Sequence, residues 1–114
     1  MRGTRMSFHE NTEELVNGVC MLEYSHAVGK WVDTFHSLHE GWAVLKEEVE
    51  EVECEFADLK SDFEHIWYSV IMDNRDGVIS CADYIQKSAI RAMKELAQVW
   101  AVCEKMKKTA KKEE

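Results

Sequence analysis

Apolar residues recur every three or four positions through the middle of the chain, which is the spacing of one face of an α-helix. From 38 to 59 the steps alternate strictly between four and three, whereas a strand would require a repeat of two. The apolar positions are Leu38, Trp42, Leu45, Val49, Val52, Phe56 and Leu59. Ser37 precedes them and Glu40 follows three residues later, and this capping-box spacing predicts a helix that begins at Leu38.

The same rhythm continues beyond Leu59 through Phe63, Ile66 and Val70. A single helix of about 35 residues would be about 52 Å long. Ser61 opens a second capping-box pattern, which favours a break or a kink at that point. We therefore expect one long helix, bent near Ser61, with two shorter helices as the alternative.

The segment before the long helix also has helical spacing. Asn11 or Thr12 can cap a first helix, and Gly29 is a suitable stop. A connection without a clear period follows, and we expect it to be packed because Trp31 and Phe35 are too large to be left in water.

A turn and a last helix follow the long helix. The stretch 73–77, DNRDG, has the composition of a turn. Ser80 is the expected cap of a helix that runs to about Lys108. Between 96 and 103 only Gln98 is polar, which predicts that this helix is central and buried nearly all round.

Length and composition favour one all-α domain. The chain has 114 residues and contains no proline. We expect a flexible N-terminus at 1–10, a single all-α domain at 11–108 and a charged tail at 109–114. The long helix presents more apolar surface than two short partners can cover, so we expect a bundle of three or four helices that is completed by oligomerisation.

Charge and cysteine content narrow the class of protein further. The net charge of -8 and the pI of about 5.1 disfavour binding to a nucleic acid polymer, which needs a basic surface. No apolar run approaches the ~18 residues of a membrane span, and the start of the chain lacks the apolar core of a signal peptide. The four cysteines form no C-x-x-C motif, so we expect reduced, mostly buried thiols in a cytoplasmic protein without a membrane partner.

Two pairs of polar side chains carry the candidate chemistry. Glu48 and Glu51 are three residues apart on the long helix, and Glu95 and Gln98 have the same spacing on the last helix. This spacing places two side chains about 5–6 Å apart on one helix face. If the helices pack antiparallel, both pairs can converge on one Mg²⁺ ion, which prefers oxygen ligands. A solvated acidic face is the alternative for 47–55.

Three short segments resemble a known family. Residues 47–51, EEVEE, match the E-E-x-x-E motif of the MazG-like all-α nucleoside triphosphate pyrophosphohydrolases, and residues 95–98, ELAQ, resemble their later E-x-x-D motif. Residues 39–43, HEGWA, are similar to the H-E-G-Y-A segment of small phage-type members. The resemblance covers about 37–105.

The resemblance implies a helical bundle, usually a homodimer or homotetramer, that binds Mg²⁺ or Mn²⁺. It also implies cleavage of a (d)NTP to the (d)NMP and pyrophosphate, with the metal polarising the phosphate and activating water. By motif position, Glu48, Glu51 and Glu95 would be metal ligands, with Gln98 at the fourth position. Glu47 would assist them, so that Glu47 and Glu48 are the catalytic candidates.

Gln98 stands where these enzymes have Asp. An amide oxygen can bind magnesium, but it brings no charge and cannot act as a base. A helical protein that binds or sequesters a nucleotide without efficient turnover is therefore a second hypothesis. A helical oligomeric scaffold is a third, because the apolar residues of the long helix follow a heptad repeat.

Basic and aromatic side chains supply further candidate contacts for a nucleotide. Lys94, Arg91 and Lys105 could bind phosphate, although a solvated helix surface is the default interpretation of each. Trp42 could stack on a base, and packing in the core or in an interface is the alternative.

Overall fold

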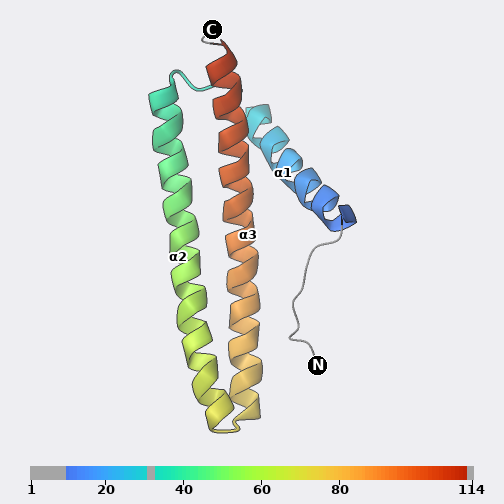
Figure 1. Cartoon of the computed structure of the whole chain (residues 1–114), viewed down its shortest axis with the longest axis vertical. Coiled ribbons are helices and arrows are strands. Elements are labelled where there is room, and N and C mark those ends of the chain that lie inside the picture. Colours follow the sequence, from blue (N-terminus) through green and yellow to red (C-terminus); the bar gives the residue numbers. More distant parts are fainter. Residues whose placement is uncertain (1–9, 31–32, 113–114) are drawn as a thin grey trace.

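The computed structural model describes residues 10–30 and 33–112, and regular structure in these ranges is entirely α-helical. The helices are α1 (Glu10–Lys30), α2 (Leu38–Ile71) and α3 (Arg75–Lys112) (Figure 1). The all-α fold class predicted from the sequence is therefore confirmed. The expectations for 1–9, Trp31 and 113–114 concern residues outside the described ranges.

Helices α2 and α3 form a long antiparallel hairpin, and α1 lies obliquely against one end of α3 (Figure 1). Among the described residues, α1 contacts α3 and not α2. The molecule is elongated, with extents of 60 × 30 × 24 Å. The prediction that the last helix is central is confirmed, because α3 alone packs against both of the others.

Helix α2 runs unbroken through Ser61, so the alternative of two shorter helices is wrong. The hydroxyl of Ser37 accepts a hydrogen bond from the backbone N–H of Glu40 at 3.1 Å, as the capping box predicts. The Glu40 carboxylate instead accepts a hydrogen bond from the ring of His36 at 2.9 Å. This bond lowers the pKa of Glu40. The Glu40 carboxylate therefore binds His36, and not the backbone N–H of Ser37 as a full capping box would require.

Helix α3 begins earlier than predicted, because Asn74 and not Ser80 is its cap. The side chain of Asn74 accepts a hydrogen bond from the N–H of Gly77 at 3.0 Å. The turn itself is only three residues long. Asp73 adopts a left-handed conformation, with φ 50°, and the N–H of Asn74 donates to the carbonyl of Ser69 at 2.8 Å. This is the Schellman arrangement that ends many helices. It reverses the chain direction by Asn74, so residues 75–77, which were expected in the turn, already belong to α3.

The two other helix boundaries also extend beyond the predicted ones. Helix α1 already includes Asn11 and Thr12 and continues through Gly29 to Lys30. Helix α3 continues past Lys108 to Lys112, so 109–112 is not a separate tail. The last turn of α3 contains basic side chains, and their positive charges stabilise it by interacting with the negative end of the helix dipole.

Thr109 anchors this last part of α3 to the connection between α1 and α2. Its hydroxyl accepts a hydrogen bond from the backbone N–H of Phe35 at 2.9 Å and donates to the carbonyl of Lys105 at 2.8 Å. Thr109 is 2% exposed. A buried hydroxyl with both bonds satisfied holds the connection against the helix end.

Small side chains at the α2–α3 contact allow the two backbones to approach closely. Ser88, Ala92 and Ala101 of α3 are buried, and Val52 of α2 lies in the same core. Gly41 is also buried. It leaves no room for a side chain, because a Cβ atom there would meet Met106 of α3 and the ring of Phe35. The buried apolar side chains are Cys20, Tyr24, Val52, Ala92, Ala97, Ala101 and Val102.

Burial is less extensive than the sequence predicted. Leu96 and Cys103 are exposed, so α3 is not buried nearly all round: within the described residues it has only two neighbouring helices. All four cysteines are free thiols, but Cys54 and Cys103 are exposed, so the expectation of mostly buried thiols is wrong for these two. No helix in the described ranges is both long enough and apolar enough to span a membrane.

Candidate metal site

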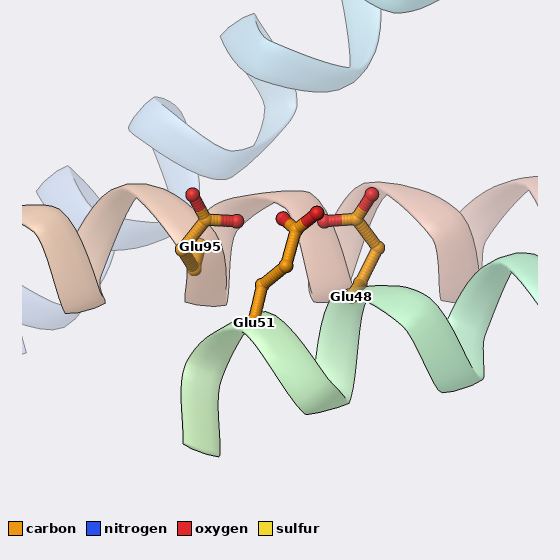
Figure 2. A group of neighbouring side chains, drawn as sticks. All are labelled: Glu48, Glu51 and Glu95. Atoms are coloured by element: carbon orange, nitrogen blue, oxygen red, sulfur yellow. The ribbon is translucent and has the colours of Figure 1, made fainter. Parts of the chain in front are cut away.

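Three carboxyl groups from two helices meet on one side of the α2–α3 hairpin. Glu48 and Glu51 lie one turn apart on α2, and the antiparallel packing brings Glu95 of α3 opposite them (Figure 2). Each contributes an oxygen, and these oxygens all lie within 4.8 Å of one another. We call this group the acidic cluster. It contains three of the four polar side chains that were paired by sequence spacing.

Two carboxyl groups of the acidic cluster, those of Glu95 and Glu48, lose their protons less readily than an isolated carboxyl group. A hydrogen bond with Glu51, burial, and the charges of Glu51, Glu48 and Glu55 together raise the pKa of Glu95 to about 7. Burial, followed by the charges of Glu51 and Glu47, raises the pKa of Glu48. At neutral pH the cluster therefore retains a shared proton or requires a cation in its place.

One oxygen of the acidic cluster lacks a partner. The Oε2 atom of Glu48 is buried and has no hydrogen-bond partner among the described residues. Leaving a buried carboxylate oxygen unpaired costs on the order of 1–3 kcal/mol or more. Three carboxylates supply the hard oxygen ligands that Mg²⁺ and Mn²⁺ prefer, so the donor set fits either ion.

Arg91 marks the edge of the acidic cluster. Its Nε atom donates to Glu55 at 2.9 Å, and its terminal nitrogen donates to the hydroxyl of Ser88 at 3.0 Å. Glu55 is therefore neutralised by an ion pair, whereas the part of the chain that the structure describes places no such cation on the three members of the cluster. Half of the Arg91 side chain is exposed, so part of its guanidinium can still meet an anion from solvent.

Gln98, the fourth residue of the pattern, is bound to the first helix. Its side-chain amide donates a hydrogen bond to the carboxylate of Glu23 on α1. Glu23 is thus a residue of the site region that the sequence did not identify, because no local spacing relates α1 to α3. Glu23, Lys94 and Gln98 line an open groove of about 360 Å³ between these two helices, together with Val19, Ile90, Met93 and Ala97.

The remaining predicted site residues do not join the acidic cluster. Glu47 is exposed on α2 next to it. Lys105 lies about 15 Å further along α3 than Glu95, with its ammonium 4.3 Å from the centre of the Phe35 ring. Trp42 precedes Glu51 by nine residues, which at 100° per residue places it on the opposite face of α2. Trp42 is 60% exposed there and does not line the site in this chain.

Comparisons with protein-family models, with curated proteins and with solved structures find no match for this chain. The fold and the site alone thus define its class. It is an all-α protein in which two antiparallel helices share a cluster of three carboxyl groups.

Proposed function

We propose that this protein is a metal-dependent nucleotide pyrophosphohydrolase, which cleaves a (d)NTP to the (d)NMP and pyrophosphate. The observation that carries the proposal is the convergence of Glu48, Glu51 and Glu95 from two helices without a neutralising side chain among the described residues. Such a group favours a divalent cation, and a nucleoside triphosphate is a ligand that an acidic protein binds through one.

A bound Mg²⁺ would supply the charge that polarises a phosphate and lowers the pKa of a water molecule. The side chains have separate tasks in this proposal. Glu48 and Glu51 would hold the cation, and Glu95 would join them as a ligand in its deprotonated form. Glu47 is exposed beside them and is the carboxylate that would accept a proton from the attacking water. Arg91 would contribute positive charge to the phosphates.

The test is to incubate the purified protein with a panel of nucleoside and deoxynucleoside triphosphates, with and without Mg²⁺. Pyrophosphate and monophosphate are measured for the wild type and for Glu48→Gln and Glu51→Gln. We expect release that depends on metal and falls at least a hundredfold in both variants. Glu64→Gln is the matched control, because Glu64 is exposed about 20 Å further along α2 than Glu51. Equal release from all four proteins would contradict the proposal.

A second function, nucleotide binding without efficient turnover, is favoured by the state of Gln98. This residue brings no charge, and its amide is engaged by Glu23. Under this alternative, the wild type would bind a nucleotide but release no pyrophosphate, and Gln98→Asp would raise hydrolysis. Rapid pyrophosphate release by the wild type would exclude it. Neither release nor binding would leave the third hypothesis, a helical oligomeric scaffold.

A further inference from the structure

The groove between α1 and α3 lies beside the acidic cluster. Helix α1 borders α3 on the side away from α2 (Figure 1). The groove has a volume of about 360 Å³, and small-molecule sites typically measure about 300–1,000 Å³. Gln98 lines the groove and follows Glu95 by three residues, so the Cβ atoms of these two residues are about 5–6 Å apart. A ligand that is held at the acidic cluster therefore reaches the groove by crossing one turn of α3.

The walls of the groove are apolar and come from both helices. Val19 of α1 lines it together with Ile90 and Met93 of α3, and these side chains are 60%, 52% and 60% exposed. A flat ring between them would remove part of this apolar surface from water. The polarisable sulfur of Met93 also makes favourable contacts with aromatic rings. The walls therefore suit a planar ring with two apolar faces, such as a nucleobase.

Polar side chains supply both kinds of hydrogen-bonding group to the same groove. The carboxylate of Glu23 accepts a hydrogen bond from the amide of Gln98. A carboxylate has about four acceptor sites on its two oxygens, and this contact uses one of them. Among the described residues, neither Glu23 nor the ammonium of Lys94 belongs to an ion pair. The groove thus offers an acceptor with unused capacity and, on α3, a cation that lacks an anion.

Guanine is the nucleobase whose polar groups match this set. Its N1–H and N2–H₂ groups are neighbouring donors, and one carboxylate accepts from both at once. Its O6 and N7 atoms are acceptors, and a lysine ammonium is a common partner of both. Adenine and cytosine have a ring-nitrogen acceptor beside the amino group, and uracil and thymine have a carbonyl on each side of N3–H. With each of these four bases, an oxygen of Glu23 would face another acceptor.

We infer that the groove between α1 and α3 binds the base of the nucleotide and selects guanine. Glu23 accepts from N1–H and N2–H₂, and Lys94 donates to O6 or N7. Gln98 holds the Glu23 carboxylate in position, and an aspartate in its place would repel that carboxylate. The sugar then crosses one turn of α3 toward the phosphates at the acidic cluster. This inference rests on the proposed function, because it takes a nucleoside triphosphate as the ligand.

The test is the binding of nucleosides to the full chain, without phosphate or metal, measured by equilibrium dialysis. We expect guanosine to bind at least about tenfold more tightly than adenosine, cytidine or uridine. Inosine lacks the 2-amino group and should lose most of this preference. Glu23→Gln should bind guanosine at least about tenfold more weakly, because an amide has a single acceptor oxygen and no charge. Its carbonyl still accepts from Gln98, so the melting temperature should stay close to that of the wild type.

Glu14→Gln is the matched control on the same helix. Glu14 is exposed and precedes Glu23 by nine residues, which at 100° per residue places it on the opposite face of α1. This variant should bind guanosine as tightly as the wild type does. Equal binding of all four nucleosides would overturn the inference, and so would a preference for guanosine that survives in Glu23→Gln. No binding of guanosine at about 1 mM would also overturn it.

The same measurement separates this inference from the proposed function, because it requires neither a metal nor hydrolysis. A protein that prefers guanosine but releases no pyrophosphate from any triphosphate would support the groove as a guanine site and contradict the hydrolase. A protein that releases pyrophosphate from all triphosphates at equal rates, without a preference among nucleosides, would support the hydrolase and overturn the role of the groove.

Discussion

Glu95 is the residue on which the electrostatics of the acidic cluster depend most. Its carboxyl group is in contact with Glu51 across the two helices, and the pKa of Glu95 is raised to about 7. A carboxylic acid with this pKa is half protonated under physiological conditions, so it responds to small changes in pH and to cations. Two predictions follow from this property.

The first prediction concerns the pH dependence of stability. In the unfolded chain Glu95 ionises at its ordinary pKa near 4.5, and in the folded protein it ionises near 7. Between these values the folded state holds the extra proton, so the contribution of Glu95 to the free energy of unfolding falls as pH rises from 4.5 to 7. Above pH 7 this contribution stays at its low level.

Glu95→Gln removes the titrating group and keeps a hydrogen-bond donor toward Glu51. The variant should therefore be more stable than the wild type by about 1–2 kcal/mol at pH 8, after allowance for solvent screening, and nearly equal to it at pH 4.5. Urea unfolding at the two pH values measures the difference. An identical pH dependence of the two proteins would show that Glu95 has its ordinary pKa.

The second prediction concerns stabilisation by a divalent cation without any nucleotide. At pH 8, Mg²⁺ or Mn²⁺ at a hundred times its dissociation constant should stabilise the wild type by about 2.7 kcal/mol. Glu51→Gln should lose most of this gain, and Glu64→Gln should retain it. The melting temperature with and without metal is the measurement. A wild type whose melting temperature does not respond to either ion would remove the basis of the proposed function.

At the scale of the helices, two glycines show how the same residue type serves different purposes. Gly18 lies on the exposed surface of α1, and a Cβ atom there would meet nothing within 4 Å. Gly41 lies in the first turns of α2, where a Cβ atom would be 2.9 Å from Met106 and from the ring of Phe35. Gly41 is therefore required for close packing, whereas Gly18 only weakens its helix.

The third prediction compares alanine at these two positions. Gly18→Ala should raise the free energy of unfolding by about 0.5–1 kcal/mol, because alanine loses less backbone entropy in a helix. Gly41→Ala should lower it by about 1–2 kcal/mol, because the gain in helix propensity is smaller than the cost of displacing two packed side chains. Chemical denaturation of both variants under one condition gives the comparison. Stabilisation by both substitutions would mean that Phe35 and Met106 adjust freely.

At the scale of the whole molecule, the helices are held in place by few polar contacts between distant segments. Among the described residues, the hydroxyl of Thr109 links the end of α3 to the backbone of Phe35, which precedes α2. Gln98 links α3 to Glu23 of α1. These contacts join segments 74 and 75 residues apart along the chain. They tie α3 to the connection before α2 and to the middle of α1.

The fourth prediction tests the Thr109 contact. Thr109→Val keeps the shape of the side chain but leaves the N–H of Phe35 without its acceptor, so we expect a loss of about 1–3 kcal/mol. Thr109→Ser retains the hydroxyl and should lose less than half as much. Thermal unfolding followed by circular dichroism distinguishes the two variants. Equal losses would indicate that the methyl group, and not the hydrogen bond, is the important part of this side chain.

The features that could be predicted were those that depend on neighbouring residues. Apolar spacing predicted the all-α class and the continuity of α2, and the Ser37 cap predicted its first residue. The same spacing put Glu48 and Glu51 on one face, because residues three apart in a helix always share a side. The start of α3 was mispredicted even though it is local, because Asp73 takes the left-handed conformation and lets Asn74 act as the cap.

Helical spacing could offer the meeting of Glu95 with Glu48 and Glu51 only on the condition that the helices pack antiparallel, and the other contacts between helices were not accessible in this way. The register of α2 against α3 decides that Glu95 meets Glu51 while Arg91 meets Glu55. The oblique position of α1 decides that Gln98 is bound by Glu23. Helical spacing gives the direction of each side chain around its own axis, but the alignment of two axes is set by many weak packing contacts between residues far apart in the chain. For the same reason, only the folded chain reveals which half of the α2 heptad repeat is buried and which is exposed.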